Sequence, residues 1–253
     1  TATRRPIDIV EISCPGARDA MFNMDDSKIF TTCQQEPKGM AVIDVEARKE
    51  IKMVPIKGGR AGGMDPQGKY FMVSASKSVH FFDSQTAELV KTIKVPGGGG
   101  NFTCLKDGSK CYVGLRKANA VGVIDMAKLE LMKTIETGPD ANRLYLNPGN
   151  SRYGLFANEA GKSDIVSIID TQLDVKVKDI WTGLGPHNVA FDPDGKFAVI
   201  STKKENVATL VDTGSADPND WDVITTDLDS GIQNNGVRWV PSPAALKKAL
   251  AQN

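Results

Sequence analysis

Histidine is scarce in this chain, and several motifs that carry chemistry are missing from it. The 253 residues include only two histidines, His80 and His187. A copper or zinc site needs several His or Cys ligands that converge, so two histidines from different segments do not predict one. The sequence lacks CxxC and CxxCH, which argues against a zinc ribbon and a c-type haem attachment. It also lacks GxSxG, and the glycine run at 97–100 is not followed by the GK[ST] of a phosphate loop.

Charge of one sign and long apolar runs are missing too. Lys and Arg number 31, Asp and Glu number 31, and neither kind forms a block. Nucleic-acid-binding proteins usually carry a basic excess or stripe, so nucleic acid is not an expected partner. No apolar run approaches the ~20 residues that span a bilayer, and no membrane-spanning segment is expected. The first residues, TATRRPIDIVEIS, contain no signal-like segment, as would be found after removal of an export signal or after trimming.

The four cysteines leave two interpretations open. They are Cys14, Cys33, Cys104 and Cys111. Cys104 and Cys111 flank the turn LKDGSK and could approach each other across a hairpin to form a disulfide. The turn register does not clearly place them opposite each other, and free, half-buried thiols are the alternative.

What the chain does contain is an internal repeat. The turn-forming segments NMDDSKIF, MDPQGKYF, LKDGSKCY, LNPGNSRY and FDPDGKFA begin at residues 23, 64, 105, 146 and 191, so successive copies are 41, 41, 41 and 45 residues apart. A second marker ends in an aspartate in every copy: Asp44, Asp83, Asp125, Asp170 and Asp212. Two independent markers in the same phase, five times over, indicate five structural units.

Each unit reads as four short strands. The first is apolar and ends in a turn rich in Asp, Pro and Gly. The second is β-branched and aromatic, as in KFAVIST, and the third ends at the aspartate, whose side chain can bond amides of the next turn. The fourth alternates apolar with charged residues, as an outer strand does. Four strands in a period of ~40–45 residues are typical of a β-propeller, so the predicted fold class is all-β.

Two copies of the unit resemble the repeat of a known family. The stretches GPHNVAFDPDGKFAVIST…VATLVDT and GSKCYVGLRKANAVGVIDMAKLELMKTIET are similar to the YVTN-type β-propeller repeat, with its GP start, DGK turn, YV strand and ID or VD strand. The resemblance covers roughly residues 15–226. This family includes surface-layer proteins, periplasmic binding subunits and heavy chains of redox enzymes. The resemblance therefore implies a fold and a periplasmic or extracellular location, with the signal peptide already removed, but no single function.

The number of blades depends on both ends of the chain. The segment 229–243 (DSGIQNNGVRWVPSP) matches the first strand of a sixth unit, and 6–13 (PIDIVEIS) reads as an outer strand. Termini that together complete one blade would close the ring and remove exposed edges. The prediction is a single propeller domain over residues 1–253 with seven blades, or six, an incomplete closing blade and a short helical tail at 243–253. Three possibilities stay open: the closing blade is incomplete in a six-bladed ring, or about one blade of sequence precedes this chain's first residue and gives seven blades, or a partner chain supplies the missing strands.

The predicted functional site is the ring of residues where the first strands of the blades begin, because these strands line the central channel. The ring is polar and mixed in charge, and no catalytic residue is assigned in it. Its members are Arg18, Asp19, Arg60, Asn101, Asp140, Asn142, Arg143, His187, Asn188, Asn235 and Arg238. His187 occupies a position that holds Asp, Arg or Asn in other units, so we interpret it as a polar ring residue and not as a metal ligand. His80, in the strand SVHFFD, is expected to be a packed or edge residue.

Two ion sites are weaker hypotheses. The loop GSADPNDWDV holds Asp217, Asp220 and Asp222. Such loops can gather oxygen ligands for calcium, although acidic loops are more often solvated. Three arginines of the ring could bind an anion, since guanidinium groups present a fork to carboxylate or phosphate; they are Arg60, Arg143 and Arg238. The alternative is that these arginines pair with Asp19 and Asp140 between blades.

The favoured function is a non-catalytic binding or scaffolding subunit of an exported multi-protein complex, with a redox enzyme complex as one form. The repeat, the sparse histidines, the balanced charge and the missing catalytic motifs favour it. No cofactor is predicted in this chain, and a haem, quinone or metal would belong to one of the other protein subunits. One alternative is an enzyme with its site in the funnel, either a lactonase-like hydrolase or a dehydrogenase heavy chain. The other alternative is a surface-layer or adhesion module.

Overall fold

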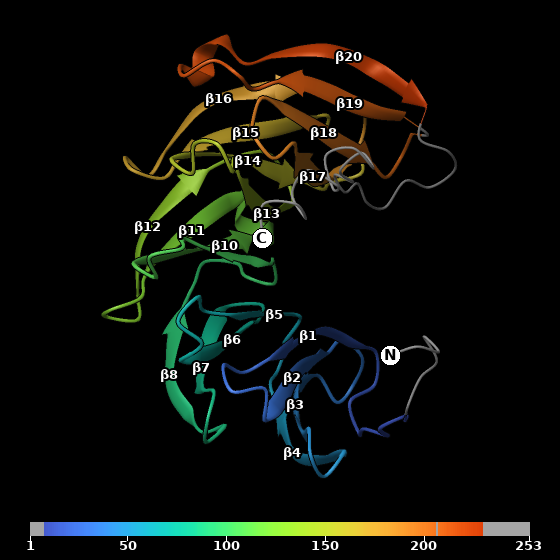
Figure 1. The fold of residues 1–253 in the computed structure, drawn as a ribbon, viewed down its shortest axis with the longest axis vertical. Coiled ribbons are helices and arrows are strands. Elements are labelled where there is room, and N and C mark those ends of the chain that lie inside the picture. Colours follow the sequence, from blue (N-terminus) through green and yellow to red (C-terminus); the bar gives the residue numbers. More distant parts are fainter. Residues whose placement is uncertain (1–7, 206, 230–253) are drawn as a thin grey trace, which may run out of the picture. The chain divides into compact units, whose positions relative to one another are not determined.

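Five four-stranded antiparallel sheets make up the described part of the chain (Figure 1). The structure is a computed structural model that describes residues 8–205 and 207–229. The chain divides into two compact units, residues 1–144 and 145–253. Two short 3-10 helices, Arg116–Ala118 and Pro218–Asp220, are the only helices in the described ranges, and neither is long and apolar enough to cross a membrane.

Within every sheet the strands follow one another in chain order, so each sheet is an up-and-down meander. The first sheet consists of β1 (Ala17–Phe22), β2 (Lys28–Cys33), β3 (Gly39–Asp44) and β4 (Lys49–Pro55). The second consists of β5 (Ala61–Met64), β6 (Tyr70–Ser74), β7 (Ser78–Asp83) and β8 (Leu89–Lys94). The third consists of β9 (Phe102–Cys104), β10 (Lys110–Leu115), β11 (Ala120–Asp125) and β12 (Glu130–Glu136).

The remaining two sheets repeat the pattern. The fourth consists of β13 (Ala141–Leu146), β14 (Tyr153–Asn158), β15 (Ile165–Asp170) and β16 (Val175–Trp181). The fifth consists of β17 (Pro186–Phe191), β18 (Phe197–Thr202), β19 (Val207–Asp212) and β20 (Asp222–Asp229). The five units that the sequence repeat predicts are therefore confirmed, each with four strands.

The repeated aspartates act as predicted, because each accepts backbone N–H groups of the turn that follows the third strand. The bonds to Ala47, Thr86, Lys128, Leu173 and Gly214 measure 2.8, 2.8, 3.0, 3.0 and 2.9 Å. Three of the five first turns use a glycine with left-handed backbone, with φ of 64° at Gly68, 72° at Gly108 and 70° at Gly195, and the first sheet uses Asp26 with φ of 56°. Hydrogen bonds within each turn thus fix both turns of a four-stranded sheet independently of the rest of the chain.

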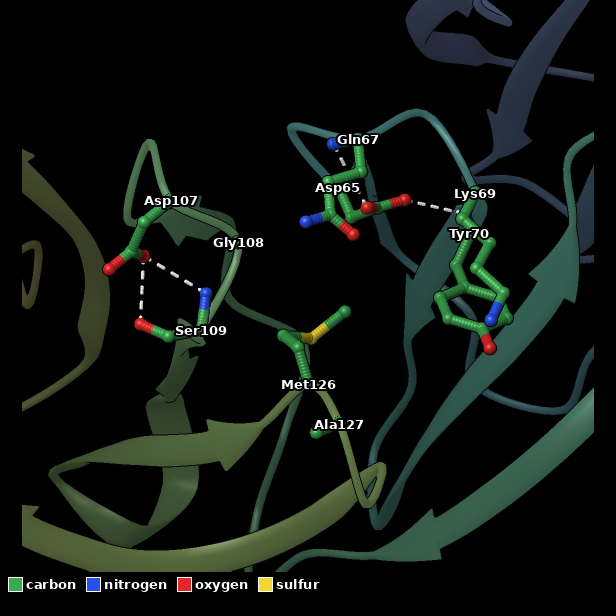
Figure 2. A pocket seen from close by; sticks show the side chains of 9 residues that line it. All are labelled: Asp65, Gln67, Lys69, Tyr70, Asp107, Gly108, Ser109, Met126 and Ala127. Atoms are coloured by element: carbon green, nitrogen blue, oxygen red, sulfur yellow. Dashed lines mark hydrogen bonds between the residues drawn. The ribbon is translucent and has the colours of Figure 1, made fainter.

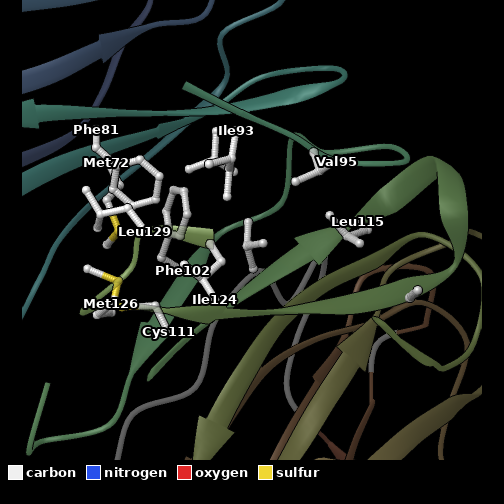
Figure 3. Packing of buried hydrophobic residues seen from close by; sticks show 13 residues of the cluster. Met72, Phe81, Ile93, Val95, Phe102, Cys111, Leu115, Ile124, Met126 and Leu129 are labelled. Carbon is white, nitrogen blue, oxygen red and sulfur yellow. The ribbon is translucent and has the colours of Figure 1, made fainter. Parts of the chain in front are cut away.

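Neighbouring sheets pack face to face through apolar side chains. In the first unit, one buried cluster joins the first sheet to the second, with Phe30 and Phe71 stacked at 5.1 Å between ring centroids. A second cluster joins the second sheet to the third and includes Phe81, Phe102 and Ile124 (Figure 3). The middle strands are buried along most of their length, as in β10 and β14, so both faces of a sheet supply apolar side chains. Burial of these side chains is the main stabilising term.

The second unit packs its sheets in the same way. Its buried cluster joins the fourth and fifth sheets around Trp221, which is 1% exposed. The Trp221 indole packs edge to face on Tyr153, at 6.0 Å between centroids, and donates to the Ser215 carbonyl at 2.9 Å. The insertion that lengthens the last repeat therefore brings a buried tryptophan into the core.

Two disulfides hold the first unit. The bond between Cys104 and Cys111 is formed, because the register of β9 and β10 places these two residues directly opposite each other. A second bond joins Cys14, ahead of β1, to Cys33 at the end of β2. No free cysteine remains. Free thiols, the alternative interpretation of the sequence, are thus ruled out, and two disulfides indicate an oxidising, extracytoplasmic environment.

The glycine run at 97–100 makes a close backbone crossing. A Cβ on Gly100 would lie 2.5 Å from the Gly114 Cα and 2.8 Å from the Asn142 carbonyl oxygen. Backbone hydrogen bonds join the same segments, from Gly100 N to Gly114 O at 3.0 Å and from Asn101 N to Asn142 O at 2.9 Å. Only glycine permits this approach, which positions Asn101 and Asn142 for the contact described below.

The blade count beyond five, and the single domain over the whole chain, stay predictions. Residues 8–13 form no strand, so the outer strand predicted at 6–13 is not observed in the described part of that segment. An outer strand needs a partner to pair with, and none of the described strands pairs there. The rest of the predicted closing blade, residues 230–243, and the tail at 243–253 lie outside the described residues.

Candidate functional site

The meander topology gathers the predicted ring residues at one end of each sheet. The start of the first strand, the loop from second to third strand and the exit of the fourth strand all lie at this end. We call it the loop face of each unit. The opposite end, which carries the Asp- and Gly-rich turns, is the turn face.

On the loop face of the first unit, four polar side chains form one network. The Arg116 guanidinium pairs with the Asp140 carboxylate and also donates to the Asn142 amide oxygen at 3.1 Å. That oxygen accepts a second bond from the Asn101 amide, at 3.1 Å. Asp140 has a left-handed backbone, φ 60°, and its N–H donates to the Asn119 side chain at 3.1 Å. The network therefore holds Asp140 and Asn142 in fixed positions.

The other ring residues of this unit are Arg18, Asp19, Arg60 and Arg143. Arg18 and Asp19 form an ion pair with each other at 3.4 Å, and Asp19 accepts the Gly62 N–H at 3.2 Å. Arg60 lies on the connection into β5, where its N–H donates to the Ser74 carbonyl at 3.0 Å. Arg143 is exposed on β13. Arg116, from a loop between second and third strands, pairs with Asp140. The pairing of Arg60, Arg143 and Arg238 with Asp19 and Asp140 stays a prediction.

On the loop face of the second unit, a buried carboxylate contacts a histidine and a lysine. The Glu159 side chain is 5% exposed, and its Oε1 lies 3.0 Å from His187 Nε2. Its Oε2 lies 3.4 Å from Lys203 Nζ. Asn188 continues the chain of contacts, with its amide nitrogen 3.0 Å from His187 Nδ1 and its amide oxygen bonded by the Tyr145 hydroxyl.

This arrangement assigns the tautomer of His187. A carboxylate only accepts, so Nε2–H donates to Glu159, and Nδ1 accepts from the Asn188 amide. Both ring nitrogens are thus engaged by protein groups. The arrangement orients a polar surface, and a ring engaged on both sides is poorly placed to ligate a metal or to take a proton from a substrate.

The last ring residues, His80 and the calcium candidates remain to be placed. Asn235 and Arg238 lie outside the described residues. His80 lies in β7, as expected for a packed residue, with its ring between Ser78 Oγ at 2.9 Å and Thr92 Oγ1 at 3.0 Å, and burial lowers its pKa.

The weak calcium candidates do not assemble, since the described residues contain no group of three or more His, Cys, Asp or Glu that could hold a metal. Asp217 instead caps the short helix through the Asn219 N–H at 2.9 Å.

A hollow of about 330 Å³ lies on the turn face of the first unit, between the first turns of the second and third sheets (Figure 2). Its polar groups are used by the turns themselves. Asp65 accepts the N–H groups of Gln67, at 3.1 Å, and Tyr70, and Asp107 accepts the Ser109 N–H at 3.0 Å. The bonds from the Ser109 N–H and from the Ser109 hydroxyl lower the pKa of Asp107. The hollow is explained by turn geometry.

A larger hollow, of about 480 Å³, lies at the rim of the loop face of the second unit and is lined by Leu184, Val207 and Asp227 among others. Exposed apolar side chains border it at the ends of the outer strands. Trp181, the last residue of β16, is 68% exposed, and Leu184 and Leu228 are each 37% exposed. Single exposed apolar residues are common, but an exposed tryptophan beside a hollow is a typical protein-contact feature.

Sequence reasoning missed the partners of the ring residues. Arg116, Glu159 and Lys203 all lie in loops between second and third strands. A signal for them was present, because the repeat phase places every such loop at the same end as the ring. The ring was predicted only from the starts of the first strands.

No family model and no curated protein sequence matches the chain. Solved structures do match. A chain of Kuenenia stuttgartiensis hydrazine synthase is 17% identical with a TM-score of 0.58, and the match covers 92% of each chain. A Bacteroides fragilis protein provisionally named a 6-phosphogluconolactonase is 19% identical with a TM-score of 0.68, over 85% of this chain and 70% of that one. A protein of unknown function from Desulfotomaculum acetoxidans is 13% identical with a TM-score of 0.64, over 83% and 69%. At these identities the likeness shows the fold alone, which is that of a β-propeller.

Proposed function

We propose that this chain is an extracytoplasmic binding propeller, a subunit that is not catalytic by itself and that docks a protein partner. The observation that carries the proposal is the exposed Trp181 beside the rim hollow of the second unit. Tryptophan supplies large contact area at low entropic cost and is enriched among the residues that dominate interface energies. Leu184, which lines the hollow, and Leu228 are further partly exposed apolar side chains on the loop face of this unit.

The polar loop faces support a binding role rather than chemistry. In the first unit Arg116 bonds both Asp140 and Asn142, and in the second unit His187 bonds Glu159. Side chains fixed in this way present a pre-organised surface, which reduces the entropic cost of association. Catalysis by His187 would require one of its ring nitrogens to leave its present partner.

A place in a redox complex is the more specific form of the proposal. The match to a hydrazine synthase chain over 92% of both chains supports it, as do the two disulfides, which suit a protein outside the cytoplasm. In that form a haem, quinone or metal is carried by the partner, and this chain holds the partner in place.

The test is co-purification of a partner with wild-type and variant chains. Trp181→Ser removes the proposed anchor from an exposed position, so the unfolding midpoint should not change. We expect a partner at fixed stoichiometry with the wild-type chain and at least a tenfold weaker association with Trp181→Ser. Ile224→Ser is the matched control, because Ile224 is 53% exposed on β20, near the turn-face end. Retention of the partner by Trp181→Ser would contradict this docking site, and absence of any partner would contradict the proposal.

A lactonase-like hydrolase is the second candidate. The match to the Bacteroides fragilis protein favours it. Lactone hydrolysis by the purified chain that is lost in His187→Gln would support the enzyme over the binding subunit.

A further inference from the structure

The Cys104–Cys111 disulfide differs from the Cys14–Cys33 disulfide in what it joins. Cys14 lies in an irregular segment ahead of β1, and its bond to Cys33 ties that segment to the first sheet. Cys104 and Cys111 are instead opposite residues of β9 and β10, two strands that already pair as one hairpin. Their bond therefore closes a turn that the backbone also closes.

Hydrogen bonds hold the turn between Cys104 and Cys111 without the disulfide. The Leu105 N–H donates to the Lys110 carbonyl at 2.9 Å, and the Gly108 N–H donates to the Leu105 carbonyl at 2.9 Å. A carboxylate in the turn accepts two further bonds, from the N–H and the hydroxyl of Ser109 at 3.0 and 2.8 Å (Figure 2). A disulfide stabilises mainly by restricting the unfolded chain, and it does so least when the loop that it closes is as short as this one.

The repeat shows that the hairpin needs no covalent bond at this position. In three of the other sheets, the residues that flank the first turn are also opposite each other, and they are apolar pairs: Phe22 with Ile29, Met64 with Phe71, and Phe191 with Ala198. No disulfide joins the strands of these hairpins. Reduced Cys104 and Cys111 would fill the same place, because a thiol packs as a small apolar group and both residues contact the apolar cluster between the second and third sheets (Figure 3).

The two disulfides also differ in exposure. Cys14 and Cys33 are 4% and 0% exposed, so both sulfurs are shielded from thiols in solution. Cys111 is 0% exposed too, but Cys104 is partly exposed, and every residue of the turn 105–110 is partly or fully exposed. Exposed disulfides exchange readily with thiols, whereas buried structural ones resist reduction. Cys104 is therefore the point at which a thiol can attack.

We propose that Cys104–Cys111 is an exchangeable disulfide, which a dithiol reductant opens while the chain stays folded, and that Cys14–Cys33 is structural. A thiolate of the dithiol attacks the Cys104 Sγ, the bond to Cys111 breaks, and the Cys111 sulfur leaves as a thiolate and takes up a proton. The second thiolate of the dithiol then attacks its own sulfur in the mixed disulfide, and the Cys104 sulfur leaves and is protonated in turn. The chain gains two electrons and two protons, and the dithiol becomes a disulfide.

The experiment is reduction of the purified, folded chain with dithiothreitol, followed by alkylation of the free thiols and mass spectrometry of the peptides. We expect Cys104 and Cys111 to become alkylated about tenfold or more faster than Cys14 and Cys33. The circular dichroism spectrum should not change during this step. Reoxidation with glutathione disulfide should restore the bond.

Single variants test which sulfur is attacked. Cys111→Ala leaves the partly exposed Cys104, which should take up one glutathione from glutathione disulfide. Cys104→Ala leaves the buried Cys111, which should react about tenfold more slowly or less. Equal rates in the two variants would contradict attack at Cys104. Melting curves show whether each variant is folded.

The double variant Cys104→Ala/Cys111→Ala tests whether the fold can do without the bond. We expect it to melt as a folded chain, with a Cys14–Cys33 bond that resists dithiothreitol as in wild type. A double variant that does not fold would overturn the proposal, because the bond would then be structural.

Two further results would overturn the proposal. One is reduction of both disulfides of the wild-type chain at the same rate. The other is reduction of Cys104–Cys111 only together with loss of the circular dichroism signal, since opening would then require unfolding. Neither result bears on Trp181, and failure of partner docking would leave this inference untouched, because both cysteines belong to the first unit.

Discussion

At the scale of single residues, short acidic side chains fix the turns, and one of them also forms a buried ion pair. The Asp170 side chain is 4% exposed and accepts from Arg152 Nε at 2.9 Å and Nη2 at 2.6 Å. Burial acts to raise the pKa of Asp170, but the bonds from Arg152 and from the Leu173 and Gln172 N–H groups outweigh it and lower the pKa. The repeated turn aspartate is therefore held in its ionised form.

Asp170→Asn should lower the free energy of unfolding at pH 7 by about 1–3 kcal/mol, because the amide keeps one acceptor but loses the charge that Arg152 pairs with. The unfolded-state pKa is about 3.9 and the folded-state pKa lies below it. The ionised group therefore stabilises the fold above that pH, and the stabilisation is lost as the pH falls through the folded-state pKa. The difference between wild type and variant should thus shrink below about pH 4.

Urea unfolding followed by tryptophan fluorescence measures this difference, since all three tryptophans belong to the second unit. Asp194→Asn is the control, because Asp194 is exposed in a turn of the same unit. A difference that persists unchanged down to pH 2 would argue against ionisation as its source.

At the scale of elements, the close crossing of the glycine run against β10 and β13 determines how the loop face of the first unit is built. Gly100 faces Gly114 and the Asn142 carbonyl with no room for a methyl group. The Asn101–Asn142 contact and the Arg116–Asn142 bond both depend on this approach. Glycine at position 100 is thus required by the backbone and not by a ligand.

Gly100→Ala should cost about 3 kcal/mol or more, at the upper end of overpacking effects, because the clash is with backbone atoms that cannot rotate away. The melting temperature should fall by at least about 6 °C. Gly214→Ala is the control, since its Cβ would meet Asp212 Oδ1 at 3.3 Å and otherwise only Lys196 side-chain atoms at 3.7 Å. Differential scanning calorimetry measures both, and equal melting temperatures for the two variants would contradict the crossing as described.

At the scale of the whole molecule, the sequence predicts what is repeated and local. Five copies of two turn markers predict five four-stranded sheets, and each marker is formed by bonds within its own turn. The Cys104–Cys111 pair was visible as a hypothesis because both residues flank one turn, whereas Cys14 lies in an irregular segment with no repeat signal.

The candidate sites were predictable only in part, because they depend on packing between units of the repeat. The ring prediction included Arg60 and His187 but not their neighbours Lys117 and Glu159, which come from other loops. The exposure of Trp181 could not be read from an alternating strand, since inward and outward positions look alike when both carry apolar residues.

The central claim is that this propeller works as one subunit of an extracytoplasmic complex. The most direct measurement is the native mass of the particle isolated without overexpression, compared with its denatured chains and its visible absorption spectrum. The account predicts a particle heavier than the 27.2 kDa chain, with a second chain in fixed ratio and, for a redox complex, visible absorption from that second chain. A single colourless chain of 27.2 kDa would contradict it.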